Sequence, residues 1–204
     1  MRRRRILTGV AATLGAGGLL LTGALPSTAT TTASQQRTVQ ATAVGAQAGN
    51  ITFVTRQFNC YGEYGCYAFA QLPKTWKRIA LGRGQDRFKD PARDRMVRFN
   101  VQVGGRVSTA TAIKQKKAAL KGTRGLRVVG TSTVRMPNTA LGQVTVSTIV
   151  YTYRRGNTTR WVATRYIGPA GSAMIEITVA GAPKDRKVLG TVINRATRTI
   201  TLAG

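Results

Sequence analysis

The stretch Met96-Val97-Arg98-Phe99-Asn100-Val101-Gln102-Val103 alternates apolar and polar residues without a break. Successive side chains of a β-strand point to opposite faces, so this pattern predicts a strand over 96–103 with one buried and one solvated face. Other strand-like runs are separated by Gly-rich or basic turns, a spacing that favours antiparallel hairpins. These runs cover 51–55, 67–71, 126–134, 143–153, 160–167, 174–179 and 199–202.

The run 143–153 changes its apolar face part of the way along. Val144 and Val146 share one parity, whereas Ile149, Tyr151 and Tyr153 share the other. Two structures would explain this pattern, a β-bulge or a central strand that is covered on both faces.

Two segments carry the signals of helices. Ser108 is suited to cap the first, Ile113 and Leu120 are seven residues apart, and Gly122 is placed to end it. The second follows Pro183, with Asp185 at its positive end and with inward apolar residues Val188, Leu189, Val192 and Ala196. This order of elements predicts an α+β fold, an antiparallel sheet flanked by two or more helices.

Residues 1–29 have the three parts of a secretory signal: a basic start, an apolar run over 6–25 and small residues at Ser27 and Ala29. We expect cleavage after Ala29, although a run of ~20 residues could also remain as a membrane anchor. The arginines at 2–5 fit either a plain basic region or a twin-arginine signal. Residues 30–49 have almost no large apolar side chain and predict a flexible leader, which leaves 50–204 as one domain.

Cys60 and Cys66 are the two cysteines of the chain. An even number of cysteines at short spacing in an exported protein predicts one disulfide, which would staple a hairpin or loop. Two thiolates without histidine cannot complete a zinc site, and a nucleophilic cysteine would lack its base. The protein is therefore expected to be secreted, and extracellular or associated with the cell wall.

The composition is strongly basic, with 32 Lys and Arg, six Asp and Glu and no His, for a formal net charge of +26. Loss of the four arginines of the signal would lower this charge to +22. Acid–base chemistry needs carboxylates or imidazoles, which are scarce in this chain. We therefore expect a non-enzymatic protein with no catalytic residues, no metal and no cofactor, and with a surface that attracts polyanions.

Asp86, Asp90 and Asp94 form the one cluster of acidic residues in the sequence. A metal loop is disfavoured because the basic residues between them would cancel the field that a cation needs. These carboxylates are expected to form weak, exposed ion pairs with their basic neighbours Arg87, Lys89, Arg93 and Arg95.

Glu176 lies on the polar side of its strand-like run and should pair with an arginine, either Arg98 or Arg165. A lone carboxylate could serve catalysis only with a partner that the sequence does not offer. Gly82-Arg83-Gly84 has part of the pattern of a phosphate-binding loop, but a third glycine and a following helix are missing, so a turn is favoured.

Leu72-Pro73-Lys74-Thr75-Trp76, followed by Phe88-Lys89-Asp90-Pro91 and the alternating strand, resembles the PsbP/LpqN-like α/β/α sandwich superfamily. The resemblance covers roughly residues 67–202 and is to its exported, actinobacterial-type members. It implies a fold whose members are mostly non-enzymatic binding or assembly domains with unrelated partners, so no site is transferred. Trp76 and Phe88 should anchor the sheet face, while Pro73 and Asp90-Pro91 should set turns.

Basic side chains remain as the candidates for function. The anion-binding candidates are Lys114, Lys117 and Lys121, on one outer stripe of the first helix, together with Arg154, Arg155 and Arg165. The leading hypothesis is that they hold an anionic cell-envelope polymer or another acidic partner. One alternative is extracellular binding of nucleic acid through its phosphates, although the Tyr and Trp residues mostly fall in apolar strand patterns. The other is an assembly domain that recognises a partner protein by shape.

Overall fold

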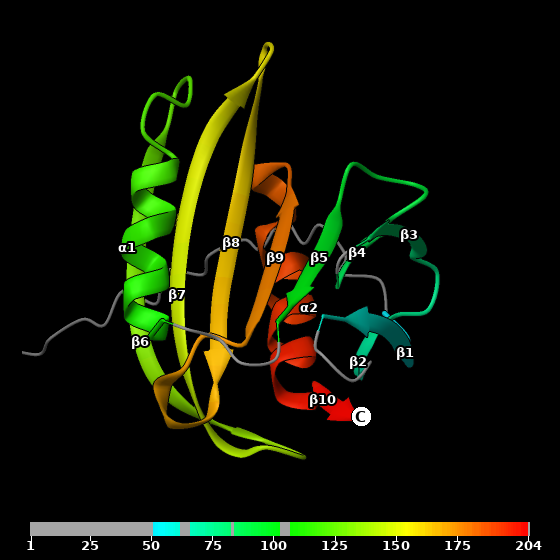
Figure 1. The fold of residues 1–204 in the computed structure, drawn as a ribbon. Helices are drawn as coiled ribbons and strands as arrows, with labels where there is room; N and C mark the ends of the chain where they lie inside the picture. The colour runs from blue at the N-terminus through cyan, green and yellow to red at the C-terminus, as the bar shows by residue number, and fades with distance from the viewer. Residues whose placement is uncertain (1–50, 62–65, 83, 103–106, 204) are drawn as a thin grey trace, which may run out of the picture. The chain divides into compact units, whose positions relative to one another are not determined.

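The computed structural model describes residues 51–61, 66–82, 84–102 and 107–203, and here the strands form two antiparallel sheets (Figure 1). The larger sheet has the order β3-β4-β5-β9-β8-β7-β6. Its strands are β3 Lys77–Gly82, β4 Gln85–Lys89, β5 Met96–Val101, β6 Arg127–Asn138, β7 Gly142–Arg155, β8 Thr158–Gly168 and β9 Ile175–Gly181. The smaller sheet has the order β1-β2-β10, with β1 Phe53–Cys60, β2 Cys66–Pro73 and β10 Thr201–Ala203.

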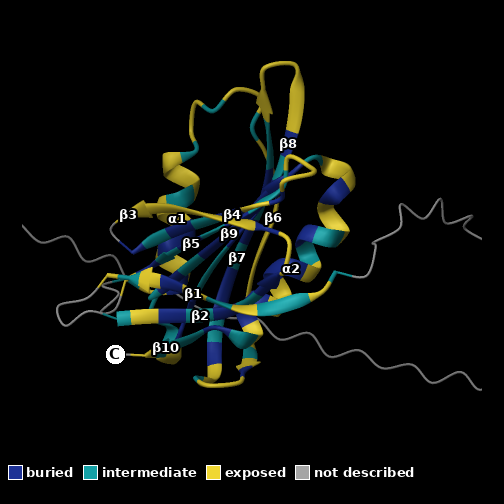
Figure 2. Cartoon of the chain, turned by 90° about the vertical axis from the view of Figure 1, so that its right-hand side faces the viewer, coloured by how far each residue is buried: buried dark blue, intermediate teal, exposed yellow. Residues whose placement is uncertain are grey.

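Helices lie on both faces of the larger sheet. Helix α1, Thr109–Ala119, packs on β7 and β8, and helix α2, Arg186–Thr199, packs between the larger sheet and β2 of the smaller one. Two short 3-10 turns, Pro169–Gly171 and Pro183–Asp185, precede β9 and α2. The predicted α+β class, an antiparallel sheet flanked by two helices, is therefore confirmed, and Figure 2 shows its buried residues along the middle of the sheet.

Strand β7 is covered on both faces, which explains its change of parity. Val144 and Val146 pack in the core under α2, whereas Ile149 and Tyr151 pack in a second cluster with Ile113 of α1. The pairing of β7 with β8 runs without a register shift, so the doubly covered strand is the correct alternative. The shift occurs instead on the neighbouring strand β6, between Val128 and Gly130.

The main core is centred on aromatic residues of three strands. Phe58, Phe88 and Phe99 are fully or almost fully buried, and the rings of Phe58 and Phe99 lie 4.3 Å apart between centroids. Trp76 is also buried in this core, which confirms that Trp76 and Phe88 anchor the sheet. Such rings bury large apolar areas and dominate core energetics. Phe58 thereby fixes the smaller sheet against β4 and β5.

The predicted helix signals are correct at both helix starts. The Ser108 hydroxyl accepts the Thr111 amide at 3.0 Å and so caps α1, and Gly122 follows the helix with φ 81°. Asp185 is the N-cap residue of α2, but its side chain makes no capping hydrogen bond. Its carboxylate lies near two arginines instead, 3.6 Å from Arg93 Nη1 and 3.9 Å from Arg95 Nη1.

Two features of the fold differ from expectation. Strands β3 and β4 were not predicted. All six residues of β3 are exposed, so it has no buried face, and one of the two buried positions of β4 is the charged residue Asp86, so it has no apolar alternation. Strands β1, β2 and β10 form a sheet of their own, where one sheet was expected.

The expected signal, 1–29, and leader, 30–49, lie outside the described residues. None of the helices in the described ranges is long and apolar enough to cross a membrane.

Candidate functional site

Every carboxylate in the described part of the chain lies within 3.9 Å of a Lys or Arg nitrogen. The pairs are Asp86 with Arg78, Asp90 with Arg95, Asp94 with Arg155 and Arg160, Glu176 with Arg98 and Lys116, and Asp185 with Arg93 and Arg95. No group of three or more His, Cys, Asp and Glu suited to a metal ion occurs among these residues. The other basic side chains of the described ranges therefore have no acidic partner there.

The prediction of weak, exposed pairs is wrong for Asp86. This side chain is fully buried, receives two hydrogen bonds from Arg78 at 2.8 and 2.9 Å, and accepts the Asn59 amide at 3.0 Å. The ion pair raises the pKa of the Arg78 guanidinium, chiefly through its hydrogen bond to the carboxylate. Alternate residues of β4 are buried, and Asp86 is one of them. Its partner Asn59 belongs to β1, so the hydrogen bond between them joins β4 to the smaller sheet.

The remaining acids follow the prediction only in part. Asp90 pairs with the expected Arg95, whose Nε donates at 2.7 Å, but the carboxylate is buried and the Arg95 side chain is only 14% exposed. Asp94 pairs with Arg160 and Arg155, which come from β8 and β7. Both partners are distant in the sequence, so spacing alone could not have found them.

Glu176 pairs with Arg98 at 3.0 Å, which is one of its two predicted partners, and with Lys116 of α1 at 3.3 Å. This ion pair lies beside a hollow of about 320 Å³ between α1 and the sheet. Tyr166 also lines the hollow. Burial raises the pKa of the Tyr166 hydroxyl, and the nearby negative charge of Glu176 raises it further. The Glu176 carboxylate is thus already held by two cations.

Four of the six anion-binding candidates lie on α1, in the turn after it and on the adjoining β7–β8 hairpin. Lys114 and Lys117 are exposed on α1, Lys121 is exposed in the turn that follows, and residues three or four apart share a helix face. The Arg154 amide donates to the Arg124 carbonyl at 2.9 Å, which joins the β7–β8 hairpin to this turn. We call Lys114, Lys117, Lys121, Arg124 and Arg154 the basic crest. None of them has an ion pair with a described carboxylate.

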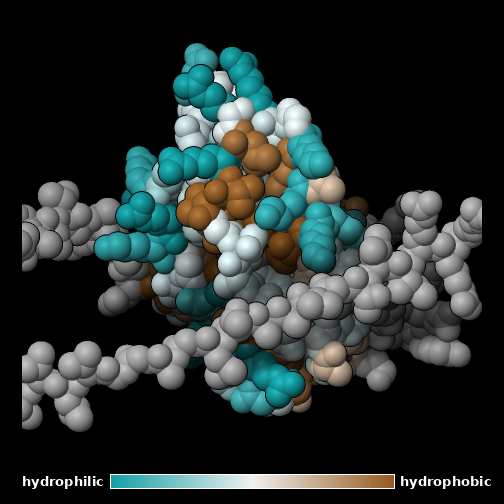
Figure 3. Space-filling model, turned by 90° about the vertical axis from the view of Figure 1, so that its left-hand side faces the viewer, coloured by the Kyte–Doolittle hydropathy of each residue, from teal (hydrophilic) through white to brown (hydrophobic). Residues whose placement is uncertain are grey.

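Figure 1 places the turn after α1 and the tip of the β7–β8 hairpin at the same end of the domain. Figure 3 looks at the side that carries α1 and β6, and hydrophilic side chains gather at its upper end, around a hydrophobic patch. Exposed valines of β6, Val128, Val129 and Val134, contribute apolar surface to this sheet edge. The basic crest therefore runs along the outer side of α1 and reaches the end of the domain where the β7–β8 hairpin turns.

The other two candidates lie elsewhere. Arg165 is largely buried and donates to α2, to Asn194 Oδ1 at 2.6 Å and Thr197 Oγ1 at 3.0 Å. Burial, with a contribution from the charge of Arg198, lowers the pKa of Arg165 to about 10, so this side chain is charged at neutral pH. Its terminal nitrogens are nevertheless already used in hydrogen bonds to α2. Arg155 lines a cleft of about 630 Å³ together with Arg93, Arg160 and Lys184, residues that sequence reasoning did not single out.

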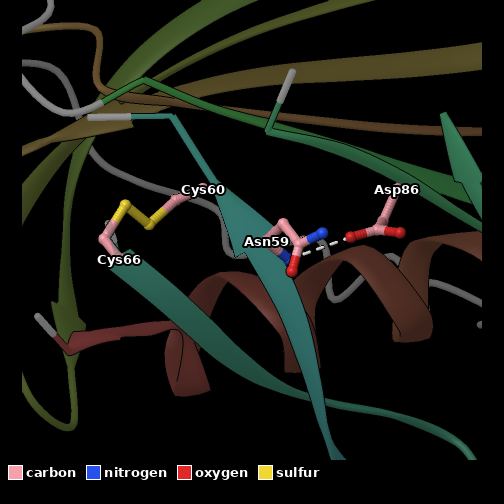
Figure 4. Close-up of a disulfide and its surroundings, with 4 residues drawn as sticks. All are labelled: Asn59, Cys60, Cys66 and Asp86. Atoms are coloured by element: carbon pink, nitrogen blue, oxygen red, sulfur yellow. Dashed lines mark hydrogen bonds between the residues drawn. A yellow bond between two sulfur atoms is a disulfide. The ribbon is translucent and has the colours of Figure 1, made fainter. Parts of the chain in front are cut away.

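Cys60 and Cys66 form the predicted disulfide, and Figure 4 shows it at the paired ends of β1 and β2. The two residues are opposite each other in the strand register, with their Cα atoms 5.3 Å apart. Tyr61 and Tyr67, beside the bridge, are more than half exposed and so are exceptions to the expected burial of tyrosines. The Asn59–Asp86 hydrogen bond lies next to it (Figure 4).

Replacing both Cys60 and Cys66 with serine is expected to lower the free energy of unfolding by about 2 kcal/mol, since the closed loop is short. Urea denaturation would measure the change. Reduction of the wild-type protein should produce the same loss and should leave the double variant unaffected. A variant as stable as the oxidised wild type would show that the bridge does not stabilise the fold.

No family model matches the sequence, and no curated protein does. The chain is similar to LpqN, involved in cell envelope biogenesis of Mycobacterium tuberculosis, with a TM-score of 0.49 and 14% identity over 74% of this chain and 92% of that one. It is also similar to PsbP (CyanoP) from Synechocystis sp. PCC 6803, with a TM-score of 0.48 and 14% identity over 78% and 99%. Both are structures of the superfamily that the sequence resembles, and at 14% identity the similarity is one of fold alone.

Proposed function

We propose that this chain is an exported, non-enzymatic binding domain whose basic crest holds an anionic cell-envelope polymer. The observation that carries the proposal is that the five cations of the crest have no carboxylate partner, while every described carboxylate is paired elsewhere. Unbalanced cations on one part of a surface attract polyanions and raise their local concentration. The crest therefore supports binding without any bond-making chemistry.

The length of the crest favours a polymer over a small anion. Lys114 and Lys121 are seven residues apart, which corresponds to about 10 Å along a helix, and Arg154 extends the row onto the hairpin. A chain with regularly spaced negative charges can contact several of these cations at once and release several counterions. A small anion can contact only one or two of them.

The expected compartment is outside the cytoplasm. A disulfide such as Cys60–Cys66 persists in oxidising environments and is rare in the cytosol. The basic and apolar start of the sequence is the pattern of an export signal. Both features agree with a polymer of the envelope as the partner.

The combined variant Lys117→Gln, Lys121→Gln, Arg154→Gln is expected to bind synthetic poly(glycerol phosphate) much more weakly than the wild type. Each lost phosphate contact should also reduce the slope of log K against log salt by about one, so the slope should fall by about three. Fluorescence titration of the labelled polymer at several salt concentrations measures both quantities.

The matched control is Lys77→Gln, Lys89→Gln, Lys187→Gln, which removes the same charge at exposed positions outside the crest. Equal weakening by the two triple variants would mean that binding depends on net charge and not on the crest. Wild-type affinity that does not change with salt would overturn the proposal. Tighter binding of a DNA duplex than of the polymer at equal salt would favour the nucleic-acid alternative.

A further inference from the structure

A second group of cations surrounds the cleft of about 630 Å³ at the start of α2. The cleft is bounded by the turn between β4 and β5, by the β7–β8 hairpin and by residues 181–185. Its charged lining consists of Arg93, Arg155, Arg160 and Lys184 against two carboxylates, Asp94 and Asp185. The cleft thus has an excess of two positive charges.

Arg160 and Asp94 form an unequal pair at the cleft. The Arg160 side chain is only 10% exposed, whereas the Asp94 carboxylate that accepts its hydrogen bond is 62% exposed. A buried guanidinium needs an anionic partner, because an unpaired charge in that position is costly. Asp94 supplies this partner from the solvent side, where another anion could take its place.

The remaining cations of the cleft have unused donors. Arg155 Nη1 lies 3.8 Å from Asp94 Oδ2, and Arg93 Nη1 lies 3.6 Å from Asp185 Oδ1, both beyond hydrogen-bond length. In the described ranges, neither side chain donates a hydrogen bond, and Lys184 has no ion pair. Three exposed cations therefore line the cleft without a side-chain hydrogen bond to another described residue.

We propose that this cleft is a separate binding site for a phosphate monoester, in which Asp94 occupies the place of the phosphate until the ligand arrives. Guanidinium forks match the oxygens of a phosphate and bind it with charge-assisted hydrogen bonds. With Asp94 displaced, four cations face the single carboxylate of Asp185, and this excess of positive charge suits a phosphate dianion. The volume exceeds that of a bare phosphate and suits one carried on a sugar-sized group.

This site is distinct from the basic crest. Arg154 and Arg155 are neighbours on β7, and successive side chains of a strand point to opposite sides. Arg154 lies against Gly125 in the turn after α1, whereas Arg155 lines the cleft with Asp94. One hairpin thus contributes to two cationic surfaces.

The test uses inorganic phosphate as the probe, at constant ionic strength and with chloride as the competing salt. Asp94→Asn removes the internal competitor, so phosphate should bind about tenfold more tightly than to the wild type, as expected for one like charge fewer at a few ångströms. Lys184→Gln, in the 3-10 turn before α2, should weaken binding, while Lys187→Gln, in the first turn of α2 but outside the lining, should leave it unchanged. Isothermal titration calorimetry measures the phosphate affinities of the wild type and the three variants.

A stability measurement separates this site from a merely structural ion pair. Asp94→Asn should lower the melting temperature, because Arg160 loses its partner, and phosphate should restore it by more than it raises the wild type. Asp86→Asn also removes a carboxylate from an arginine, but far from the cleft, so phosphate should not restore its stability. Equal phosphate affinity of Asp94→Asn and wild type, or equal restoration by chloride, would overturn the proposal. Poly(glycerol phosphate) binding is measured separately, so failure of the crest and failure of the cleft are distinguishable.

Discussion

Asp86→Ala is expected to lower the free energy of unfolding by about 3 to 5 kcal/mol, the usual cost of breaking a buried ion pair by removing one partner. The fully buried carboxylate accepts three hydrogen bonds, two from Arg78 on β3 and one from the Asn59 amide on β1. Its loss leaves that amide without its partner and removes one of the links between the two sheets. Because the Arg78 side chain is 39% exposed, water can solvate the abandoned guanidinium, and the effect should lie toward the lower end.

A double-mutant cycle with Arg78→Met is the control for this prediction. If the two residues act as a pair, the double variant should lose less stability than the sum of the two single variants. Urea denaturation of the four proteins gives the required free energies. An Asp86→Ala protein within 1 kcal/mol of the wild type would show that this ion pair contributes little to the attachment of β1.

The fold was predictable wherever burial gives a clear period. The alternation over 96–103 corresponds to β5, Met96–Val101, and the signals at Ser108 and Pro183 lead directly into α1 and α2. Strand β3 was not predicted, because an edge strand that is solvated on both faces has no periodic pattern of hydrophobic residues. The separation of β1, β2 and β10 into a second sheet was not predicted, because the sequence pattern of a strand does not identify the strand with which it pairs.

The candidate site was predictable only where neighbours in sequence are neighbours in space. The lysines of α1 could be placed on one stripe from their spacing, and the disulfide from its short loop. The meeting of Arg154 with the turn after α1 depends on strand pairing. The cleft joins residues from three separate segments, and its buried Arg160 has the sequence context of an exposed strand residue.

Gly84→Ala is expected to lower the free energy of unfolding by about 3 kcal/mol, for two reasons that add. Gly84 has φ 69°, a left-handed conformation that a Cβ atom disfavours. The added methyl group would also lie 2.6 Å from the Tyr61 nitrogen and 2.7 Å from the Val101 oxygen. These two atoms share a hydrogen bond of 2.9 Å that joins the end of β1 to β5, so either this bond opens or the turn moves.

Gly142→Ala is the matched control, because Gly142 has φ 68° but open space around its missing Cβ atom. It should show the conformational cost alone, about 1 kcal/mol. The difference between the two variants, measured by urea denaturation, then isolates the steric conflict with Tyr61 and Val101. Equal losses would mean that the backbone at Gly84 can shift freely, and that the β1 end is not fixed to β5 by this contact. A larger loss at Gly84 would mean that the close approach of Gly84 to Tyr61 and Val101 helps to hold the end of β1 against β5.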